Sequence, residues 1–383
     1  MKVYLVAGEL SGDRLGGALM VGLKALVPTV EFRGVGGSLM QAQGLESLFP
    51  MDELSVMGLS EVLPKLRHLF RRKAEVAHAV LEWQPDVLIT IDAPDFGLRV
   101  AKAVKAGSNI RTVHYVAPSV WAWRPGRAKK MARYIDHVLA LLPFEPPYME
   151  AAGMACDFVG HPVVNEPVAT TREAEAFRAR HGIKGEMLLV LPGSRRSEVQ
   201  RLEQRFGAAV AKVVAQRPGV TAVIPAAASV AGPLEERVKD WPVRPILLDP
   251  RGAVPEEFAA EKRAAFRAAD AALAVSGTVS LELAAAGTPM VIGYDQGWLS
   301  RLLAPFLLKT DTVTLVNLVT QTRVVPEFLL GRCQPGPMAA AVGRLLDAPG
   351  EQRAELARTM DLLGRGGEDP GLRAARAVLA RMG

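Results

Sequence analysis

The stretch "VYLVAGELSGDRLG", residues 3–16, decides how the chain begins to fold. Its apolar start predicts a short strand, and the glycine-rich segment after it predicts a tight turn into a helix. Glycine recurs at every fourth position from Gly8 to Gly16, and Glu9 and Asp13 stand between these glycines. The pattern is neither the GxGxxG nor the GK[ST] of a nucleotide phosphate loop, and its acids would repel phosphate. Two interpretations stay open: the acids cap the following helix, or they bind sugar hydroxyls and transfer protons.

Similar apolar runs recur along the chain, each bounded by turn residues and separated from the next by a helical stretch. This alternation predicts parallel strands that are covered by helices on both faces. The runs fall into two groups, so we expect an α/β fold with two doubly wound, Rossmann-like domains. The expected strands are residues 3–7, 87–91, 112–116, 138–142, 157–159, 187–191, 222–225, 246–248, 271–275 and 290–294.

The length of 383 residues also predicts two domains. We place their boundary in "GHPVVNEPVATTREAE" (160–175), where two prolines and polar turn residues precede a helix start. The expected domains are residues 1–165 and 166–365, followed by a short terminal helix within 366–383.

The composition is globular, with 49% hydrophobic residues, 22% charged residues and a net charge of +6. This basic excess favours anionic partners, namely nucleotides, phosphorylated substrates, anionic lipids or nucleic acid. The two cysteines, Cys156 and Cys333, exclude a disulfide framework, and the six histidines lack metal-ligand spacing, so we expect no metal. No signal peptide is expected, and Glu282 in the apolar window 271–294 favours a strand, a helix and a strand over a membrane span.

Two acids follow a later expected strand, in "ITIDAPDFGLR" (89–99). Ligands of open parallel sheets gather beyond the carboxyl ends of the strands. We therefore predict that Asp92 is a general base, and we interpret Asp95 as a cap of the next helix.

An aromatic and basic loop follows in "HYVAPSVWAWRPGRAKK" (114–130). Tryptophan next to arginine suits the face of a sugar beside a phosphate, although stacking on nucleic acid would need similar residues. The alternative is that the tryptophans pack in the core and the basic run is a solvated helix face. The residues that we assign to an acceptor-binding loop are Ser119, Trp121, Trp123 and Arg124.

Two loops in the second half resemble anion sites at helix starts. In "LLVLPGSRRSEV" (188–199), Gly193 permits close approach, Ser194 can donate, and Arg195 can bind a phosphate with both of its nitrogen arms. The alternative is a capping box, which Glu198 would form with a serine of the same loop.

The second loop lies in "VSGTVSLELAAAGTPMVIGY" (275–294). Ser276, Gly277 and Thr278 offer donors at a helix start, and Glu282 lies one turn further on, within reach of ribose hydroxyls. The alternative is a helix that is buried on most sides, in which a charged Glu282 needs a partner.

The stretch "SVMGLSEVLPKLRHLFRRK" (55–73) combines an apolar face with a cationic flank, which is typical of helices that lie on membranes. The alternative is an ordinary helix that faces its own core. Pro64 suggests that the stretch forms two pieces. The candidate membrane patch consists of Val56, Met57, Leu59, Val62, Leu63, Leu66, Leu69 and Phe70.

These segments occur together, and in this order, in one family. The chain closely resembles the lipid-A-disaccharide synthases, from residue 3 to about residue 330. "PSVWAW" and "GLSEVLP" make the likeness specific, because they are not general nucleotide motifs. The matching segments are "AGELSGDRLGG", "GVGG", "SVMGLSEVLP", "IDAPDF", "HYVAPSVWAWRPGR", "LPFE", "FVGHP", "LPGSRRSEV" and "SGTVSLELA".

The resemblance implies a GT-B glycosyltransferase, in which two Rossmann-like domains face each other across a cleft and the terminal helix packs back on the first domain. The implied reaction joins UDP-2,3-diacylglucosamine to the 6-hydroxyl of 2,3-diacylglucosamine 1-phosphate (lipid X). It releases UDP, inverts the anomeric centre and needs no metal or other cofactor. The implied place is the cytoplasmic face of the anionic inner membrane of a Gram-negative-type cell, with no nucleic acid as a partner.

The resemblance also assigns roles to single residues. Asp92 matches the proposed base and Glu9 an essential acid of the first loop, which leaves open which of the two takes the proton. Arg195 and Asn317 match residues of the donor site, and Glu282 resembles the ribose-binding acid of GT-B enzymes in general.

Other functions remain as alternatives at this point. One is a different UDP-sugar enzyme of the GT-B type, either an epimerase or a lipid-linked N-acetylglucosaminyl transferase. Another is a non-catalytic membrane or nucleic-acid binder, which would leave the two nucleotide-type loops and the loop carboxylates unexplained.

Overall fold

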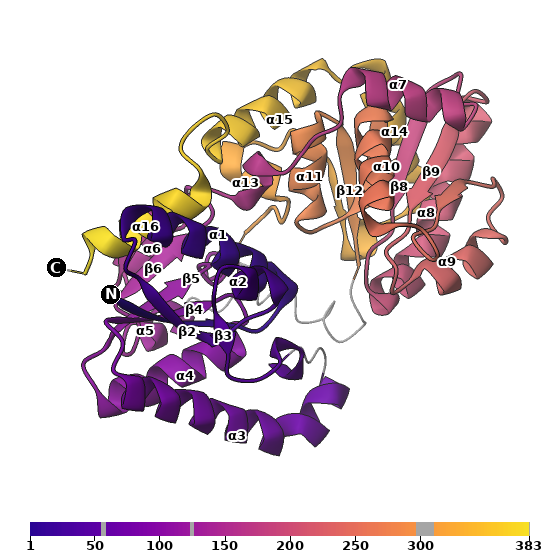
Figure 1. Ribbon diagram of the computed structural model, residues 1–383. Coiled ribbons are helices and arrows are strands. Elements are labelled where there is room, and N and C mark those ends of the chain that lie inside the picture. Colours follow the sequence, from indigo (N-terminus) through magenta and orange to yellow (C-terminus); the bar gives the residue numbers. More distant parts are fainter. Residues whose placement is uncertain (55–58, 123–125, 296–309, 383) are drawn as a thin grey trace. The chain divides into compact units, whose positions relative to one another are not determined.

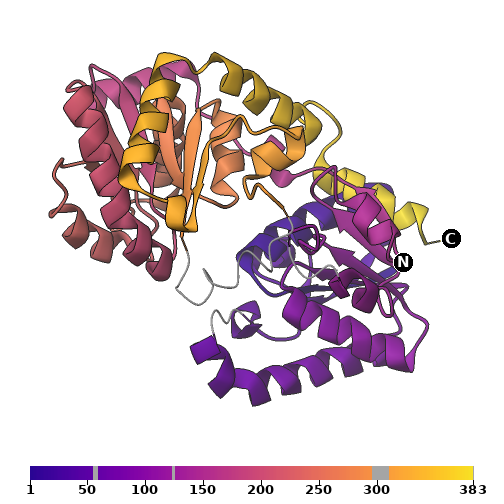
Figure 2. The same ribbon diagram turned by 180° about the vertical axis from the view of Figure 1, so that it is seen from behind.

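The computed structural model describes residues 1–54, 59–122, 126–295 and 310–382, and only the backbone of residues 59–65. The chain forms two compact units (Figures 1 and 2). The first unit contains Met1–Val164 and Leu363–Gly383, and the second contains Asn165–Leu362.

The first unit is built on a parallel sheet of seven strands in the order β3-β2-β1-β4-β5-β6-β7. Helices α1, α2 and α16 lie on one side of this sheet, and α3 and α4 lie on the other (Figure 1). In chain order the elements are β1 (Lys2–Ala7), α1 (Leu10–Leu26), β2 (Glu31–Val35), α2 (Ser38–Ala42), β3 (Glu46–Ser47), α3 (Leu59–Trp83), β4 (Val87–Ile91), α4 (Pro94–Gly107), β5 (Arg111–Tyr115), α5 (Gly126–Met131), β6 (His137–Ala140), α6 (Pro146–Glu150), β7 (Ala155–Phe158) and α16 (Pro370–Ala380).

The second unit repeats the plan with a parallel sheet of six strands in the order β10-β9-β8-β11-β12-β13. Its helices pack in two groups: α8, α9 and α14 form one, and α7, α10, α11, α13 and α15 form the other. In chain order the elements are α7 (Thr171–Arg180), β8 (Met187–Leu191), α8 (Arg196–Gln216), β9 (Thr221–Pro225), α9 (Ala231–Val238), β10 (Ile246–Leu248), α10 (Pro255–Ala268), β11 (Ala271–Val275), α11 (Val279–Ala286), β12 (Met290–Tyr294), α13 (Leu315–Thr320), β13 (Glu327–Leu329), α14 (Pro335–Asp347) and α15 (Gly350–Leu362).

The central strands are buried on both faces, which explains why nearly all of their residues are apolar. Every residue of β4, β8 and β11 is buried, because helices cover both sides of each parallel sheet. Each run that was expected to be a strand forms one, within two residues of the expected ends. The apolar window 271–294 is a strand, a helix and a strand, as expected. Among the described residues, no helix is both long enough and apolar enough to span a membrane.

Three strands and one helix differ from the sequence-based expectation. The strands β2, β3 and β13 were not expected, because they are short and place charged or half-buried residues at or near the sheet edges. Helix α3 is a single helix, although Pro64 suggested two pieces. Pro64 is the sixth residue of this helix, so the one backbone hydrogen bond that it removes lies near the helix end.

The terminal helix α16 packs against α1, so the two ends of the chain belong to the same unit (Figures 1 and 2). Asp369 caps α16 by accepting hydrogen bonds from the backbone N–H groups of Gly371 (2.8 Å) and Leu372 (3.2 Å). A Cβ on Gly371 would lie 2.6 Å from the Ala18 carbonyl oxygen, so only glycine permits this close packing.

Candidate functional site

The topology of the first sheet brings two functional loops together. Strands β1 and β4 are neighbours, and their connections leave in opposite directions along the sheet, to β2 and to β5. The loop after β1 therefore meets the loop after β4 at the carboxyl edge, which is where ligands of doubly wound sheets bind. The Ser11 hydroxyl donates to Oδ2 of Asp92 over 2.6 Å, and a Cβ on Gly8 would lie 3.0 Å from the Ala93 Cβ.

The glycines of the first loop serve packing. A Cβ on Gly12 would lie 3.2 Å from the Ile91 carbonyl oxygen, and a Cβ on Gly16 would lie 2.5 Å from the Met40 sulfur. Spacing by four residues places these glycines on one face of α1, which can therefore approach β1 and β4 closely. The glycine pattern, which raised the question of a phosphate loop, therefore permits close packing of α1 against the sheet.

The two acids of this loop have different roles. Asp13 is buried and accepts hydrogen bonds from the backbone N–H groups of Gly37, Leu39 and Met40 at 2.9–3.0 Å. It therefore caps α2, so the capping interpretation is right for this acid, but the helix that it caps is not the expected one. Glu9 stands at the N-cap position of α1 without a side-chain capping bond, and it lines a cavity.

Asp92 has an unusual backbone conformation. Its φ is +50° and that of Ala93 is +38°, in the left-handed region that residues other than glycine rarely adopt. A hydrogen bond of 2.9 Å from the Asp92 N–H to the Tyr115 carbonyl on β5 holds this turn. Such strain is common where a fold presents a functional side chain.

The expected capping role of Asp95 is not found. The N-cap of α4 is Ala93, and no side chain caps this helix. Asp95 is the second residue of α4, its side chain is 96% exposed, and it lies 3.7 Å from Arg127. Its charge still suits the helix start, since the helix dipole is positive there.

A cavity of about 330 Å³ opens beside these acids, between α3 and α4. Three residues of the candidate membrane patch, Leu66, Leu69 and Phe70, line it, and Phe70 is 48% exposed. Val56 and Met57 lie outside the described residues, as do the side chains of Leu59, Val62 and Leu63.

One residue of the expected cationic flank is structural. Arg72 binds both carboxylate oxygens of Glu53, at 2.7 and 2.8 Å, and its other nitrogen arm binds Glu75 at 2.7 Å. Its guanidinium carbon also lies 4.3 Å from the centre of the Phe49 ring. Arg72 is therefore tied to the body of the first unit and is not available to anionic lipid.

The aromatic loop is held by a buried acid that the sequence analysis did not single out. The Trp121 indole N–H donates to Oε1 of Glu145 over 3.3 Å, and the Leu142 N–H donates to Oε2 over 3.1 Å. The Trp121 ring also packs edge-on against Phe144, with centroids 5.3 Å apart. Burial raises the pKa of Glu145 to about 7. Ser119 is exposed, and Trp123 and Arg124 lie outside the described residues.

The second sheet repeats the arrangement of the first. Strands β8 and β11 are neighbours, so the loop with Gly193, Ser194 and Arg195 and the loop with Ser276, Gly277 and Thr278 follow adjacent strands at one edge. Gly193 has a φ of +127°, and a Cβ there would lie 2.6 Å from the Glu198 Cβ. This position therefore requires glycine.

A carboxylate occupies the amide groups of the first of these loops. Oε2 of Glu198 accepts from the backbone N–H groups of Ser194 (3.3 Å) and Arg195 (3.4 Å). Its Oε1 lies 3.4 Å from the Arg195 guanidinium. The capping alternative is thus present, although through backbone amides and not through a serine side chain. A phosphate that binds these amides has to displace Glu198.

The remaining donor-site candidates differ in accessibility. Glu282 is about one-third exposed and is paired with Lys262 at 2.8 Å, which supplies the partner that its charge needs. Asn317 is fully buried and exchanges two 3.0 Å hydrogen bonds with the backbone of Val325. The Asn317 amide therefore holds the segment around α13 together, and it does not present a free group to a ligand.

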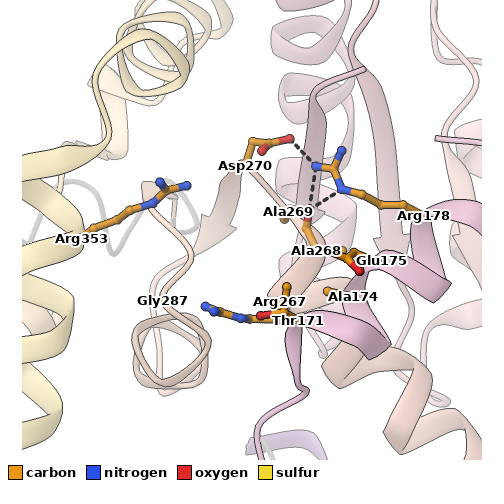
Figure 3. A pocket seen from close by; sticks show the side chains of 10 residues that line it. All are labelled: Thr171, Ala174, Glu175, Arg178, Arg267, Ala268, Ala269, Asp270, Gly287 and Arg353. Atoms are coloured by element: carbon orange, nitrogen blue, oxygen red, sulfur yellow. Dashed lines mark hydrogen bonds and ion pairs between the residues drawn. The ribbon is translucent and has the colours of Figure 1, made fainter. Parts of the chain in front are cut away.

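A second cavity, of about 520 Å³, lies at the other end of the second sheet (Figure 3). Ala268 and Asp270, which line it, directly precede β11, whereas Ser276 follows that strand. Arg178 bonds to the Ala268 carbonyl and to Asp270, and Arg267 bonds to the last carbonyl of α11 at 2.9 Å. These arginines stabilise helix ends, and the cavity is remote from the donor loops.

Comparisons with known proteins show the family to which the chain belongs. Residues 3–367 match the family model described as lipid-A-disaccharide synthetase. The chain belongs to the lipid-A-disaccharide synthase family. It is 60% identical to the lipid-A-disaccharide synthase of Ruegeria pomeroyi, over all of this chain and 96% of that protein. It is 47% identical to that of Rhodospirillum centenum, over 99% of this chain and 94% of that protein.

Solved structures show the fold shared with other enzymes. The UDP-GlcNAc 2-epimerase of Neisseria meningitidis, bound to UDP-GlcNAc, aligns over 99% of both chains with a TM-score of 0.65 at 13% identity. An E. coli trehalose-6-phosphate structure with UDP-2-fluoro glucose aligns over 100% of this chain and 99% of that one, with a TM-score of 0.60 at 11% identity. The chain therefore has the GT-B fold with two Rossmann-like domains. It is a glycosyltransferase of lipid A biosynthesis that uses a UDP-sugar.

The Glu198 contact leads to a prediction for nucleotide binding. Glu198→Gln should bind UDP roughly 3- to 10-fold more tightly, because a neutral amide competes less with phosphate and releases Arg195. Titration calorimetry measures this affinity, with Glu236→Gln as a control that removes an exposed charge from the same unit. An unchanged affinity in a folded Glu198→Gln variant would show that phosphate does not use these amides.

The buried Glu145 should make stability depend on pH. Its pKa is raised from 4.5 to about 7, so between these values the unfolded chain loses the proton first, and stability falls as pH rises. Compared with Glu145→Gln, the wild type should lose up to about 3 kcal/mol of unfolding free energy from pH 4.5 to 8. Urea unfolding followed by tryptophan fluorescence measures the difference, and parallel pH profiles of the two proteins would contradict the prediction.

Proposed function

We propose that the enzyme transfers the sugar of UDP-2,3-diacylglucosamine to the 6-hydroxyl of 2,3-diacylglucosamine 1-phosphate. The products are the β-1,6-linked disaccharide 1-phosphate and UDP. The observation that carries this proposal is the pair of acids, Glu9 and Asp92, beside an apolar cavity at the switch point of the first sheet. A site for an acylated sugar needs both a proton acceptor and an apolar surface.

In the proposed mechanism, Asp92 takes the proton of the 6-hydroxyl as its oxygen attacks the anomeric carbon. The bond from that carbon to the UDP oxygen breaks on the opposite face, so the configuration inverts and no covalent enzyme intermediate forms. Ser11 orients the base, because its hydroxyl holds Oδ2 at 2.6 Å. Glu9 is the second candidate for the base, since it lines the same cavity.

We propose that the second unit binds the UDP moiety of the donor. The N–H groups of Ser194 and Arg195 and the start of α8 would stabilise the charge that develops on the leaving UDP. The loop of Ser276, Gly277 and Thr278 adds donors, and Glu282 would bind the ribose. The proposed reaction uses no metal or other cofactor.

We also propose that the enzyme works on the cytoplasmic face of the inner membrane, where its acylated substrates lie. The exposed Phe70 beside the α3–α4 cavity supports this proposal, as does the net charge of +6. An apolar side chain flanked by positive charge favours an anionic membrane surface.

The proposed reaction is tested by incubation of the enzyme with both acylated glucosamines and mass detection of UDP and the disaccharide. Asp92→Asn should lower kcat about 10²- to 10⁴-fold, because the amide cannot accept the proton. Folding and UDP affinity should stay unchanged, which circular dichroism and calorimetry check. If Asp92→Asn keeps its turnover while Glu9→Gln loses it, Glu9 is the base.

The membrane proposal predicts weaker vesicle binding for Phe70→Ser. Removing this exposed ring should lower affinity for anionic vesicles about ten-fold or more, because less apolar area enters the bilayer surface. Sedimentation with vesicles measures the affinity. Leu48→Ser, which removes an exposed apolar residue outside the patch, is the control. Equal affinity of the wild type and Phe70→Ser would favour a helix that serves only the core.

A further inference from the structure

The α3–α4 cavity carries charges that the proposed mechanism does not use. Lys73 on α3 and Arg99 on α4 both line it. The Lys73 ammonium lies 6.0 Å from the centre of the Phe70 ring, and the Arg99 guanidinium carbon lies 5.8 Å from the same centre. Two cations from different helices therefore converge on one aromatic ring at the mouth of an apolar cavity.

Lys73 and Arg99 differ from the neighbouring Arg72 in whether they form ion pairs with carboxylates. Arg72, the residue before Lys73, is paired with two carboxylates. Neither Lys73 nor Arg99 has a carboxylate within ion-pair distance in the described part of the chain. Both cations lie within 6.0 Å of the centre of one ring, and an anion that contacts both would offset the repulsion between them. The ring contacts compensate the charges only in part.

The cavity thus has chemically different ends. Glu9 lines it, with Asp92 in the adjacent turn, and these residues form its acidic end. Lys73 and Arg99 form a basic end, and the apolar side chains of Leu66, Leu69 and Phe96 lie along the walls. Asp95 also lines the cavity, but its carboxylate faces Arg127 at 3.7 Å. A ligand that fits has a hydroxyl to deprotonate, an apolar chain and an anion.

We infer that Lys73 and Arg99 bind the anomeric phosphate of the acceptor while the cavity takes one of its acyl chains. The proposal rests on the proposed function and adds to it the residues that select this acceptor. In the acceptor, the carbons that carry the 1-phosphate and the 6-hydroxymethyl group both adjoin the ring oxygen, and the acyl chains branch from C2 and C3. One sugar ring thus presents a hydroxyl, a phosphate and apolar chains to the same cavity. The volume of about 330 Å³ is at the lower end of the range for small-molecule sites.

The test compares two acceptors, 2,3-diacylglucosamine 1-phosphate and the same compound without its phosphate. Lys73→Gln and Arg99→Gln should each lower kcat/KM for the phosphorylated acceptor about 10- to 100-fold. Both variants should change the value for the phosphate-free acceptor less than about threefold, and KM for the UDP-sugar should not change. Lys102→Gln, which removes an exposed cation from α4 outside the cavity, is the matched control.

Several outcomes would overturn the inference. If kcat/KM falls equally for both acceptors, the two cations do not recognise the phosphate. The same conclusion holds if kcat/KM falls for neither acceptor. If the variants lose affinity for anionic vesicles but keep the preference for the phosphorylated acceptor, the cations bind membrane headgroups instead.

A binding measurement separates this inference from the proposed reaction. Calorimetry with micellar 2,3-diacylglucosamine 1-phosphate should show weaker binding for Lys73→Gln and Arg99→Gln, whether or not turnover occurs. Normal phosphate-dependent binding without formation of disaccharide would contradict the proposed reaction and leave the phosphate site in place.

Variants of Leu66 test whether an acyl chain enters the cavity. Leu66→Trp should narrow the cavity and shift the preference toward acceptors with shorter acyl chains. Leu66→Met, which nearly conserves the volume, should keep the wild-type preference. An unchanged chain-length profile in a folded Leu66→Trp variant would show that no acyl chain enters this cavity.

Discussion

The functional geometry depends on one topological constraint, which is the point in each sheet where the strand order reverses. A parallel strand must be reached by a crossover, and the crossovers on the two sides of this point leave the sheet in opposite directions. The loops that follow the two strands at this point therefore diverge, and a crevice for a ligand lies between them at the carboxyl ends of the strands. In the first unit this point joins the loops of Ser11 and Asp92, and in the second it joins those of Arg195 and Ser276.

The two reversal points carry different groups. The first carries acids, a strained backbone turn and an apolar cavity, which suits a proton acceptor beside an acylated sugar. The second carries a glycine turn at a helix start, which suits a phosphate, although Glu198 now occupies its amides. In the proposed function, one fold repeated in two units supplies both the acid that the acceptor needs and the donors that a leaving nucleotide needs.

Several charged residues show why residue type alone does not assign a role. Asp13, Asp92 and Asp95 are the same kind of side chain near the same sheet edge, yet one caps a distant helix, one lies at the strand end and one faces solvent. Arg72 and Lys73 are neighbours on α3, but only Arg72 finds two carboxylates. Asn317, expected at the donor site, is buried against Val325. In each case the contacts that the folded chain makes decide the role.

The sequence by itself determined the fold class, the central strands and the loops at both sheet edges, because buried parallel strands must be apolar runs that end in turns. Its motifs also identified the family. Only the tertiary structure decided which charges are satisfied within the fold and which face a cavity. It also showed that Glu145 holds Trp121 and that Phe70, Lys73 and Arg99 converge. These contacts join different elements. The periodicity of apolar residues along one helix or strand does not show which side chains of another element lie beside it.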